Sequence, residues 1–275
     1  MNTATLVDGV VTDRIDAQDR GLLYGDGVFE TIAFVAGCAP LWPRHMARLR
    51  DACARLRLQC LDESVLAGEC AQVLGARARG VVRITLTRGS GERGYAPALD
   101  ARTRRIVAAF AAVPAPADWY ARGIRVRFCA TRLAQQPALA GIKHLNRLEQ
   151  VLARAEWNDA GIAEGLMFDF SENLVCATAA NLFAVIGERL LTPPVDTCGV
   201  AGVARAEVLA RRPDCVVAPI RREDLRRADE VFLTSSVRGI VPVASTPEAE
   251  YLPGVQTRDL QRAWRTLGLQ PELMP

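Results

Sequence analysis

The stretch that decides how this sequence is interpreted is Leu139-Ala140-Gly141-Ile142-Lys143-His144-Leu145-Asn146-Arg147-Leu148-Glu149-Gln150-Val151-Leu152. Lys143 is the only lysine in the 275-residue chain, and the remaining 33 of the 34 Lys and Arg side chains are arginine. A lysine amine can lose its proton and attack a carbonyl to form a Schiff base, whereas arginine stays protonated in proteins. Lys143 is therefore a candidate nucleophile. The competing interpretation is a lysine that was kept by chance or in a buried ion pair.

The composition is that of an ordinary globular protein, with 50% hydrophobic and 24% charged residues. A net charge of +3 suits an anionic small molecule, and a nucleic-acid-binding protein would usually be more basic. The N-terminus lacks the pattern of a signal peptide, and no apolar run reaches the ~18 residues of a membrane span. We therefore expect a cytoplasmic protein with no nucleic-acid or membrane partner.

The cysteines and histidines do not suggest a metal centre. The eight cysteines contain no paired Cys-x-x-Cys spacing, and the chain has two histidines. Zinc sites in proteins are usually built from such pairs, so no metal is expected. In the cytoplasm these cysteines are expected to stay reduced.

Apolar periodicity predicts two α/β domains, consistent with a prior of about 150 residues per domain. In the first domain, residues 1–113, strands and helices are predicted over residues 4–11, 28–35, 44–57, 62–79, 81–88 and 104–112. Residues 114–119 are rich in Pro and Ala and are the predicted linker. The second domain is then 120–275.

The second domain is predicted to contain strands at 124–130, 181–186 and 230–234, a hairpin over 165–178, and a helix that begins near Gly202. A further helix is predicted to begin at Lys143, with one apolar face formed by Leu145, Leu148, Val151, Leu152 and Ala155. Lys143 would then lie just past the linker, where a cleft between the two domains is expected.

Two other segments of the second domain could accompany the lysine in a pyridoxal phosphate (PLP) site. Gly199-Val200-Ala201-Gly202-Val203-Ala204-Arg205 is a glycine-containing turn that enters a helix, and the first amides of a helix attract a phosphate. Such a turn is usually a plain loop when it stands alone. Its interpretation as a phosphate site is stronger here, because the chain also has the lysine and the hydroxyls of Thr234-Ser235-Ser236, which end a predicted strand.

Five motifs follow one another along the chain. They are Asp26-Gly27-x-Phe29-Glu30, His45-x-x-Arg48-Leu49, Lys143, Ala180-Asn181-Leu182-Phe183 and the Gly199–Arg205 turn. In this the chain resembles the fold-type IV PLP enzymes, which include branched-chain and D-amino-acid aminotransferases and aminodeoxychorismate lyases. The resemblance implies an α/β (α+β) fold of two lobes with PLP between them. It also implies a homodimer.

Within this group, residues 88–95 and 139–152 are most similar to the lyases. The resemblance then implies the conversion of 4-amino-4-deoxychorismate, an anionic small molecule, to 4-aminobenzoate and pyruvate in folate biosynthesis. The alternatives are an aminotransferase of the same fold and a homologue that binds a ligand without catalysis.

The resemblance also assigns roles to individual residues. Lys143 matches the Schiff-base lysine, and the matches to phosphate ligands are Arg48, the backbone of Val203 and Ala204, and the hydroxyl of Ser236. Thr31 matches a threonine that assists proton transfer. The residues expected to face the substrate are Arg93 and Arg88, whose guanidinium groups bind carboxylates well, and Ser235. His45 and His144 receive no role.

Cys176 departs from the family pattern. It stands where the family has a glutamate that pairs with the pyridine nitrogen of PLP. A carboxylate keeps that nitrogen protonated, and a thiol does so less well. Transamination depends more strongly on this protonation than elimination does, so Cys176 favours the lyase over the aminotransferase. It is also the one feature that supports a catalytically weak homologue.

Overall fold

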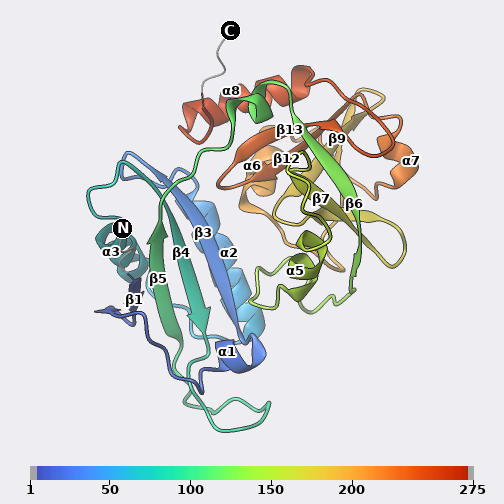
Figure 1. Ribbon diagram of the computed structural model, residues 1–275. Coiled ribbons are helices and arrows are strands. Elements are labelled where there is room, and N and C mark those ends of the chain that lie inside the picture. Colours follow the sequence, from blue (N-terminus) through green and yellow to red (C-terminus); the bar gives the residue numbers. More distant parts are fainter. Residues whose placement is uncertain (1–4, 272–275) are drawn as a thin grey trace. The chain divides into compact units, whose positions relative to one another are not determined.

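The computed structural model describes residues 5–271, so residue 4 of the first predicted strand lies outside it. The chain forms two compact units, each with its own sheet (Figure 1). Unit 1 contains the described residues up to Val113 together with Ile142–Asn146. Unit 2 contains Pro114–Gly141 and the chain from Arg147 onward.

Unit 1 is built on a five-stranded antiparallel sheet in the order β2-β1-β5-β4-β3. Its strands are β1 (Thr5–Val7), β2 (Val10–Val11), β3 (Gly27–Val35), β4 (Arg79–Thr87) and β5 (Arg104–Phe110). The predicted strand over 4–11 is interrupted because Asp8 and Gly9 both have positive φ, at 52° and 85°. An Asp-Gly pair of this kind forms the tight turn of a β-hairpin.

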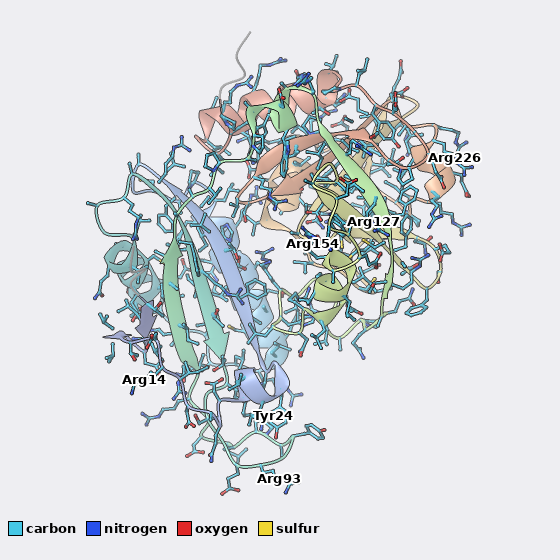
Figure 2. All side chains as sticks on the ribbon, viewed as in Figure 1. Arg14, Tyr24, Arg93, Arg127, Arg154 and Arg226 are labelled. Carbon is cyan, nitrogen blue, oxygen red and sulfur yellow. The ribbon has the colours of Figure 1, made fainter. Side chains whose placement is uncertain are left out.

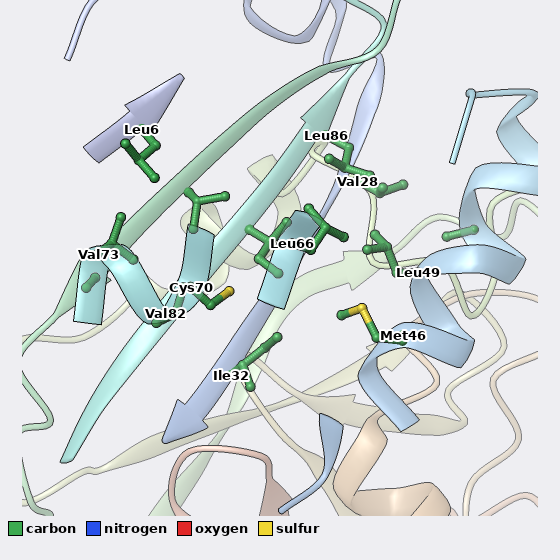
Figure 3. Packing of buried hydrophobic residues seen from close by; sticks show 14 of the residues in the cluster. Leu6, Val28, Ile32, Met46, Leu49, Leu66, Cys70, Val73, Val82 and Leu86 are labelled. Atoms are coloured by element: carbon green, nitrogen blue, oxygen red, sulfur yellow. The ribbon is translucent and has the colours of Figure 1, made fainter. Parts of the chain in front are cut away.

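Helices α2 (Trp42–Leu56) and α3 (Glu63–Leu74) cover one face of this sheet, and the short helix α1 (Arg20–Tyr24) precedes β3. Side chains of β3 alternate between the two faces, so Val28 and Ile32 point to the helices. They pack with Met46 and Leu49 of α2 and with Leu66 of α3 (Figure 3). The same alternation leaves Phe29 and Thr31 on the opposite face of the sheet.

The conformation of the segment Ile142–Asn146 differs from the helix that the sequence predicted there. It is extended rather than helical, because the Phe29 amide donates to the Lys143 carbonyl and the Leu145 amide donates to the Gly27 carbonyl, both at 3.0 Å. These bonds give partners to backbone groups on the outer edge of β3, which would otherwise be unpaired. The helix predicted to begin at Lys143 begins instead at Leu148, and the segment joins unit 1 although the sequence-based division placed it in the second domain.

Unit 2 is built on an eight-stranded mixed sheet in the order β11-β10-β9-β12-β13-β6-β7-β8. Its strands are β6 (Ile124–Leu133), β7 (Glu164–Asp169), β8 (Leu174–Ala177), β9 (Asn181–Ile186), β10 (Arg189–Thr192), β11 (Val216–Val217), β12 (Glu230–Ser235) and β13 (Gly239–Ser245). Its helices are α4 (Ala117–Ala121), α5 (Leu148–Arg154), α6 (Val203–Arg211), α7 (Arg222–Leu225) and α8 (Val255–Thr266).

Two local predictions for unit 2 have different outcomes. The hairpin over 165–178 is confirmed as β7 and β8, and its turn is held by the Asp169 side chain, which accepts from the amides of Ser171 and Asn173 at 2.9 Å. The predicted linker is partly wrong. Residues 117–121 form α4, because the aromatic side chains of Trp119 and Tyr120 pack into the apolar core of unit 2.

A buried ion cluster joins α2 to β3 in unit 1. The Glu30 carboxylate accepts from Arg48 Nε at 2.8 Å and Arg48 Nη2 at 2.5 Å, and it contacts His45 Nδ1 at 2.6 Å. Burial alone would raise the pKa of Glu30, but the Arg48 charge and the hydrogen bonds from both partners lower it below its ordinary value. The ionised carboxylate is therefore part of the folded state.

We expect Glu30→Gln to reduce the free energy of unfolding by about 3 kcal/mol at neutral pH, because Arg48 loses its counter-charge in a buried position. A carboxyl with a lowered folded-state pKa contributes stability above its unfolded pKa of about 4.5 and loses it as the pH falls through the folded-state pKa. The unfolding curves of variant and wild type should therefore converge in acid. The matched control is Glu63→Gln in the exposed Arg50–Glu63 pair, which should cost no more than about 1 kcal/mol. Equal losses in both variants would contradict the prediction.

Candidate active site

Lys143 lies beside Phe29 on the face of the unit 1 sheet opposite the helices. Its Nζ is 4.2 Å from the centroid of the Phe29 ring. The guanidinium carbon of Arg83, on β4, is 4.1 Å from the centroid of the same ring. Thr31 and Arg83 are directly paired across β3 and β4. Two basic side chains thus contact one aromatic ring, and Thr31 is the strand partner of one of them.

Arg83 is a residue that the sequence analysis missed. Burial lowers its pKa, although a guanidinium remains protonated at physiological pH. The available signal was its place in the strand Val81-Val82-Arg83-Ile84-Thr85-Leu86, where alternation sets Arg83 and Thr85 on one face and the apolar residues on the other. A charged residue on a half-buried sheet face points to binding of an anion or to an ion pair.

Arg48 lies on the helix-covered side of β3, where it binds Glu30 through Nε and Nη2. Its side chain is largely buried. The ion pair fixes the orientation of the guanidinium, because both oxygens of the carboxylate are engaged. The assignment of Arg48 to a phosphate stays a prediction.

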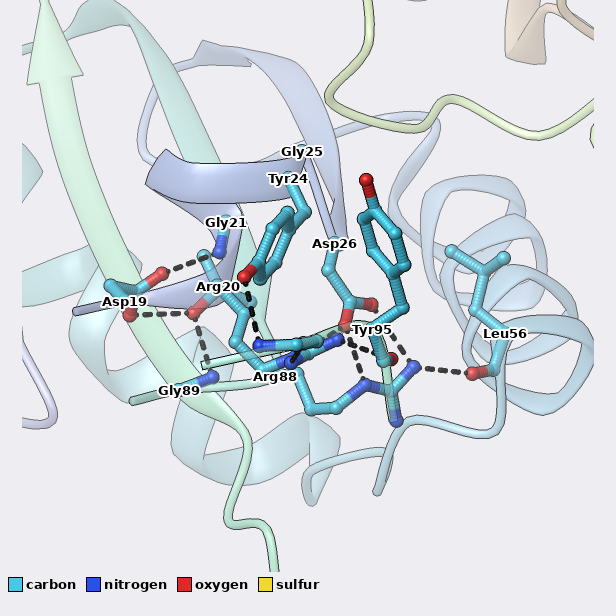
Figure 4. A network of polar contacts seen from close by, with 12 residues as sticks. Asp19, Arg20, Gly21, Tyr24, Gly25, Asp26, Leu56, Arg88, Gly89 and Tyr95 are labelled. Atoms are coloured by element: carbon cyan, nitrogen blue, oxygen red, sulfur yellow. Dashed lines mark hydrogen bonds and ion pairs between the residues drawn. The ribbon is translucent and has the colours of Figure 1, made fainter. Parts of the chain in front are cut away.

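Arg88 holds unit 1 together through a polar network (Figure 4). It donates to both oxygens of Asp26 from Nε at 2.8 Å and Nη2 at 3.0 Å. It also donates to the carbonyls of Leu56 and Arg57 at the end of α2, at 2.8 and 2.9 Å. Arg20 donates to Asp26 as well, at 3.0 Å. These contacts give Arg88 a structural role and do not support the predicted role in binding substrate.

Arg93 lies on the long loop between β4 and β5 and is exposed to solvent (Figure 2). The middle of this loop is anchored, because Arg20 donates to the carbonyls of Gly94 and Tyr95, both at 2.8 Å. The ring of Tyr95 contacts that of Tyr24 edge to face, with centroids 5.6 Å apart. The anchored loop presents Arg93 on its surface, and the role of Arg93 toward substrate stays a prediction.

The glycine-containing turn before α6 is held rigidly in unit 2. The Gly141 amide donates to the Gly199 carbonyl, and the Ala201 amide donates to the Gly141 carbonyl, both at 3.0 Å. Asn181 Nδ2 donates to the Val200 carbonyl at 2.9 Å. The residue before the helix, Gly202, offers no side chain to cap it. The amides of Val203 and Ala204 are therefore at the start of a helix with the polarity that attracts an anion.

The end of β12 contributes hydroxyl groups to unit 2. Thr234 Oγ1 is buried and hydrogen-bonds to nothing in the described part of the chain. Thr234 and Ser235 line a small hollow together with Glu164 and Arg238, whose side chains form an ion pair at 3.3 Å. Ser235 Oγ accepts from the Arg238 amide at 3.0 Å, which fixes the turn that carries Ser236.

Cys176 lies on β8 and is buried in a small apolar cluster with Cys129 and Cys198. Burial raises the pKa of its thiol to about 12, and the nearby Cys198 adds to this while the Arg147 guanidinium opposes it. The thiol is therefore neutral at physiological pH. Arg147 is itself substantially buried, which lowers its pKa. The sequence analysis did not single out this arginine.

The comparisons with known proteins identify the group to which this chain belongs. The family model for class IV aminotransferases matches residues 27–246, so the chain is a member of that family. Among its relatives, an aminodeoxychorismate lyase from Vibrio harveyi is 34% identical over 264 residues, which cover 93% of this chain and 97% of the relative. A putative branched-chain-amino-acid aminotransferase from Methanocaldococcus jannaschii is also 34% identical, over 86% of this chain and 85% of the relative.

Solved structures agree with this assignment. The crystal structure of 4-amino-4-deoxychorismate lyase from Pseudomonas aeruginosa superimposes with a TM-score of 0.91 at 45% identity, covering 95% of this chain and 98% of that chain. A branched-chain amino acid aminotransferase from Escherichia coli superimposes with a TM-score of 0.87 at 23% identity, which supports the fold alone. The predicted two-part α/β fold is thereby confirmed. Over residues 5–271, the helices lack the combination of length and apolar character that crossing a membrane requires.

We expect Gly202→Ala to disrupt the turn before α6, because an added Cβ would lie 2.0 Å from Oδ1 of the buried Asn181 side chain. Overpacking of this kind costs about 1–3 kcal/mol, and it should weaken PLP binding by about tenfold or more. A spectrophotometric titration with PLP measures this affinity. The matched control is Gly68→Ala on α3, where nothing lies within 4 Å of the new Cβ, and which should bind PLP normally. Unchanged affinity in Gly202→Ala would contradict the assignment of this turn.

Proposed function

We propose that this protein is a PLP-dependent lyase that converts 4-amino-4-deoxychorismate to 4-aminobenzoate and pyruvate. The geometric observation that carries the proposal is the chain position of its sole lysine. Lys143 follows by two residues Gly141, which is hydrogen-bonded to the turn before α6. Two residues span at most about 7 Å of backbone, so the Cα of Lys143 lies within about that distance of the Cα of Gly141. Relatives named as lyases indicate which reaction this site performs.

The residues present fit PLP. Lys143 supplies the amine for a Schiff base, and the amides of Val203 and Ala204 at the start of α6 suit a phosphate. Ser236 and Arg48 are the further phosphate ligands that the resemblance assigns. The buried hydroxyl of Thr234, which lacks a partner among residues 5–271, shows that this region has hydrogen-bonding capacity to spare.

When bound, PLP supplies an electron sink for negative charge at the carbon that bears the substrate nitrogen. The protein's own part is to orient the substrate and to move one proton. In the proposed reaction the Lys143 amine takes the proton from that carbon as a general base. The Thr31 hydroxyl assists this transfer. Loss of the enolpyruvyl group leaves an aromatic ring, so the reaction itself is strongly favourable.

Arginine side chains are the proposed ligands for the substrate carboxylates. Arg83 is the best placed of them, because it contacts the same Phe29 ring as Lys143. A guanidinium group binds a carboxylate through two parallel hydrogen bonds, which fixes both its position and its orientation. Arg93 and Ser235 remain proposed substrate contacts from the resemblance.

An aminotransferase is the second candidate function, and the 34% identity to the relative from Methanocaldococcus jannaschii is the observation that favours it. Cys176 argues against it. The resemblance places this residue opposite the pyridine nitrogen, and its buried thiol is neutral. A neutral thiol supports protonation of the nitrogen less well than a carboxylate does, and transamination depends on that protonation more than elimination does. A third candidate is a homologue that binds PLP or a metabolite without turnover.

The proposed assembly is a homodimer in the cytoplasm, with a small anionic substrate and no nucleic-acid or membrane partner. Support for the dimer comes from the resemblance and from α5. Leu148, Val151 and Leu152 are 75%, 59% and 60% exposed, and their spacing puts them on one face of that helix. The sequence analysis predicted that these residues form one apolar face of a helix. An exposed apolar face of this kind suits contact with a second copy of the chain.

We expect Lys143→Arg to abolish formation of 4-aminobenzoate and pyruvate, with a loss of about 10³-fold or more, because the charge is kept while the nucleophilic amine is removed. In the wild-type protein, borohydride reduction followed by mass spectrometry should place a pyridoxyl group on Lys143. The matched control is Arg122→Lys, which adds an exposed lysine that should stay unlabelled. Preserved turnover in Lys143→Arg would refute the assignment. A pyridoxamine form on mixing with amino acids, without pyruvate release, would favour the aminotransferase.

We expect Val151→Glu to weaken dimerisation by about tenfold or more, because it would bury an unpaired carboxylate between two apolar faces. Sedimentation velocity at several protein concentrations measures the effect. Leu252→Glu is the matched control, since Leu252 is also highly exposed but lies outside α5, and this variant should remain dimeric. A dimer of unchanged affinity in Val151→Glu would exclude the α5 face from the interface.

A further inference from the structure

The carboxylate of Glu164 is buried at the start of β7 in unit 2, with 2% of the residue exposed. Its Oε1 accepts from the Thr178 hydroxyl and from the Gly165 amide, the latter at 3.0 Å. Its Oε2 accepts from Nη1 of Arg238 at 3.3 Å. A buried carboxylate needs partners of this kind, because the loss of its hydration is strongly unfavourable. The function proposed above uses neither Glu164 nor Arg238.

The side chain of Arg238 reaches Glu164 across another strand. Arg238 directly precedes β13, and β6 lies between β13 and β7 in the sheet. Two strand spacings are about 10 Å, so the ion pair joins parts of the sheet that are not neighbours. The guanidinium carbon of Arg238 also lies 5.8 Å from the centroid of the Trp119 ring, on α4. The Arg238 side chain is therefore held at two points, although 45% of it is exposed.

Arg238 belongs to the loop that carries two of the proposed ligands. Ser235 pairs with Gly239 across β12 and β13, so Ser236, Val237 and Arg238 form a three-residue loop. The Arg238 amide donates to the Ser235 hydroxyl at 3.0 Å, and Gly239 has a φ of 71°. The backbone of Arg238 thus holds the loop to β12, and its side chain holds the loop to β7. Ser236 is a proposed phosphate ligand, and Ser235 is a proposed substrate contact.

Glu164 is also connected to the turn before α6. Thr178, which donates to Glu164, lies in the turn between β8 and β9. Asn181 begins β9, and its Nδ2 donates to the Val200 carbonyl at 2.9 Å. That carbonyl belongs to the turn whose following amides are the other proposed phosphate donors. One buried carboxylate thereby links the two segments of unit 2 that are proposed to bind phosphate.

We propose that Arg238 is a positioning residue for the phosphate of PLP, and that it acts by binding Glu164 and so fixing the loop that presents Ser236. This role rests on the proposed function, because it concerns the cofactor of that reaction. Arg238 itself contacts neither PLP nor substrate. Its loss therefore lowers the affinity for the phosphate group and leaves the affinity for the rest of the cofactor unchanged.

The test compares the binding of PLP with that of pyridoxal, which lacks the phosphate. Spectrophotometric titration of the full-length protein gives the Kd for each. We expect Arg238→Gln to weaken PLP binding by about tenfold and pyridoxal binding by less than about twofold, because only contacts to the phosphate are displaced. A role in folding alone would weaken both by the same factor. Equal losses for the two ligands, or an unchanged affinity for PLP, would overturn the proposal.

A second set of variants keeps the test valid if Arg238→Gln folds poorly with a buried carboxylate left unpaired. The double variant Glu164→Gln/Arg238→Gln removes both charges, and thermal unfolding checks that it is folded. Because Arg238 acts through Glu164, the double variant should weaken PLP binding no more than Arg238→Gln or Glu164→Gln does alone. Losses of PLP affinity that add up from the two single variants would contradict this route.

The matched control is Arg226→Gln in the exposed ion pair with Glu248, where Nε donates at 2.9 Å. This pair lies in unit 2 but outside the loop, so the ratio of PLP to pyridoxal affinity should equal that of the wild type. Wild-type protein without a preference for PLP over pyridoxal would reject the proposed function and this role with it. A preference for PLP that persists unchanged in Arg238→Gln would reject the role of Arg238 alone.

Discussion

The backbone pairing of residues 141–146 is the constraint on which the candidate site depends. Lys143 sits in this extended segment, which is hydrogen-bonded to Gly27 and Phe29 at one end of β3. Gly141, two residues earlier, is hydrogen-bonded to Gly199 and Ala201. Main-chain bonds leave little freedom to the backbone that bears the lysine, and that rigidity is what a covalently held cofactor requires. A mobile lysine would lose much of the advantage of a fixed reaction geometry.

The arginine side chains of unit 1 differ in the groups that they contact. Arg48 and Arg88 are each paired with a buried or partly buried carboxylate, Glu30 or Asp26, and so brace the structure. Arg83, by contrast, contacts an aromatic ring and a threonine hydroxyl. Of these three arginines it is therefore the one whose surroundings best suit an anionic substrate. In an arginine-rich chain, the partners of each guanidinium separate structural from functional residues.

The resemblance to the fold-type IV PLP enzymes places Cys176 where those enzymes have a glutamate. The thiol is buried, neutral and close to both Cys198 and Arg147. Replacing a carboxylate by a neutral group removes a charge that Arg147 could otherwise have paired with. In the proposed site, a neutral thiol opposite the pyridine nitrogen would suit elimination better than transamination.

The α/β class, most of the strands, the hairpin over residues 165–178 and the unusual status of one lysine could be predicted from the sequence, because they follow from local periodicity, turn chemistry and composition. The sequence also carried the family resemblance. It did not reveal β10, β13 or α8, nor that Lys143 lies in an extended segment paired with β3. Only the tertiary structure decided which arginines are already bound to carboxylates, and that Arg83 shares the Phe29 ring with Lys143. Those outcomes depend on hydrogen bonds and packing between residues far apart in the chain, which local sequence patterns do not encode.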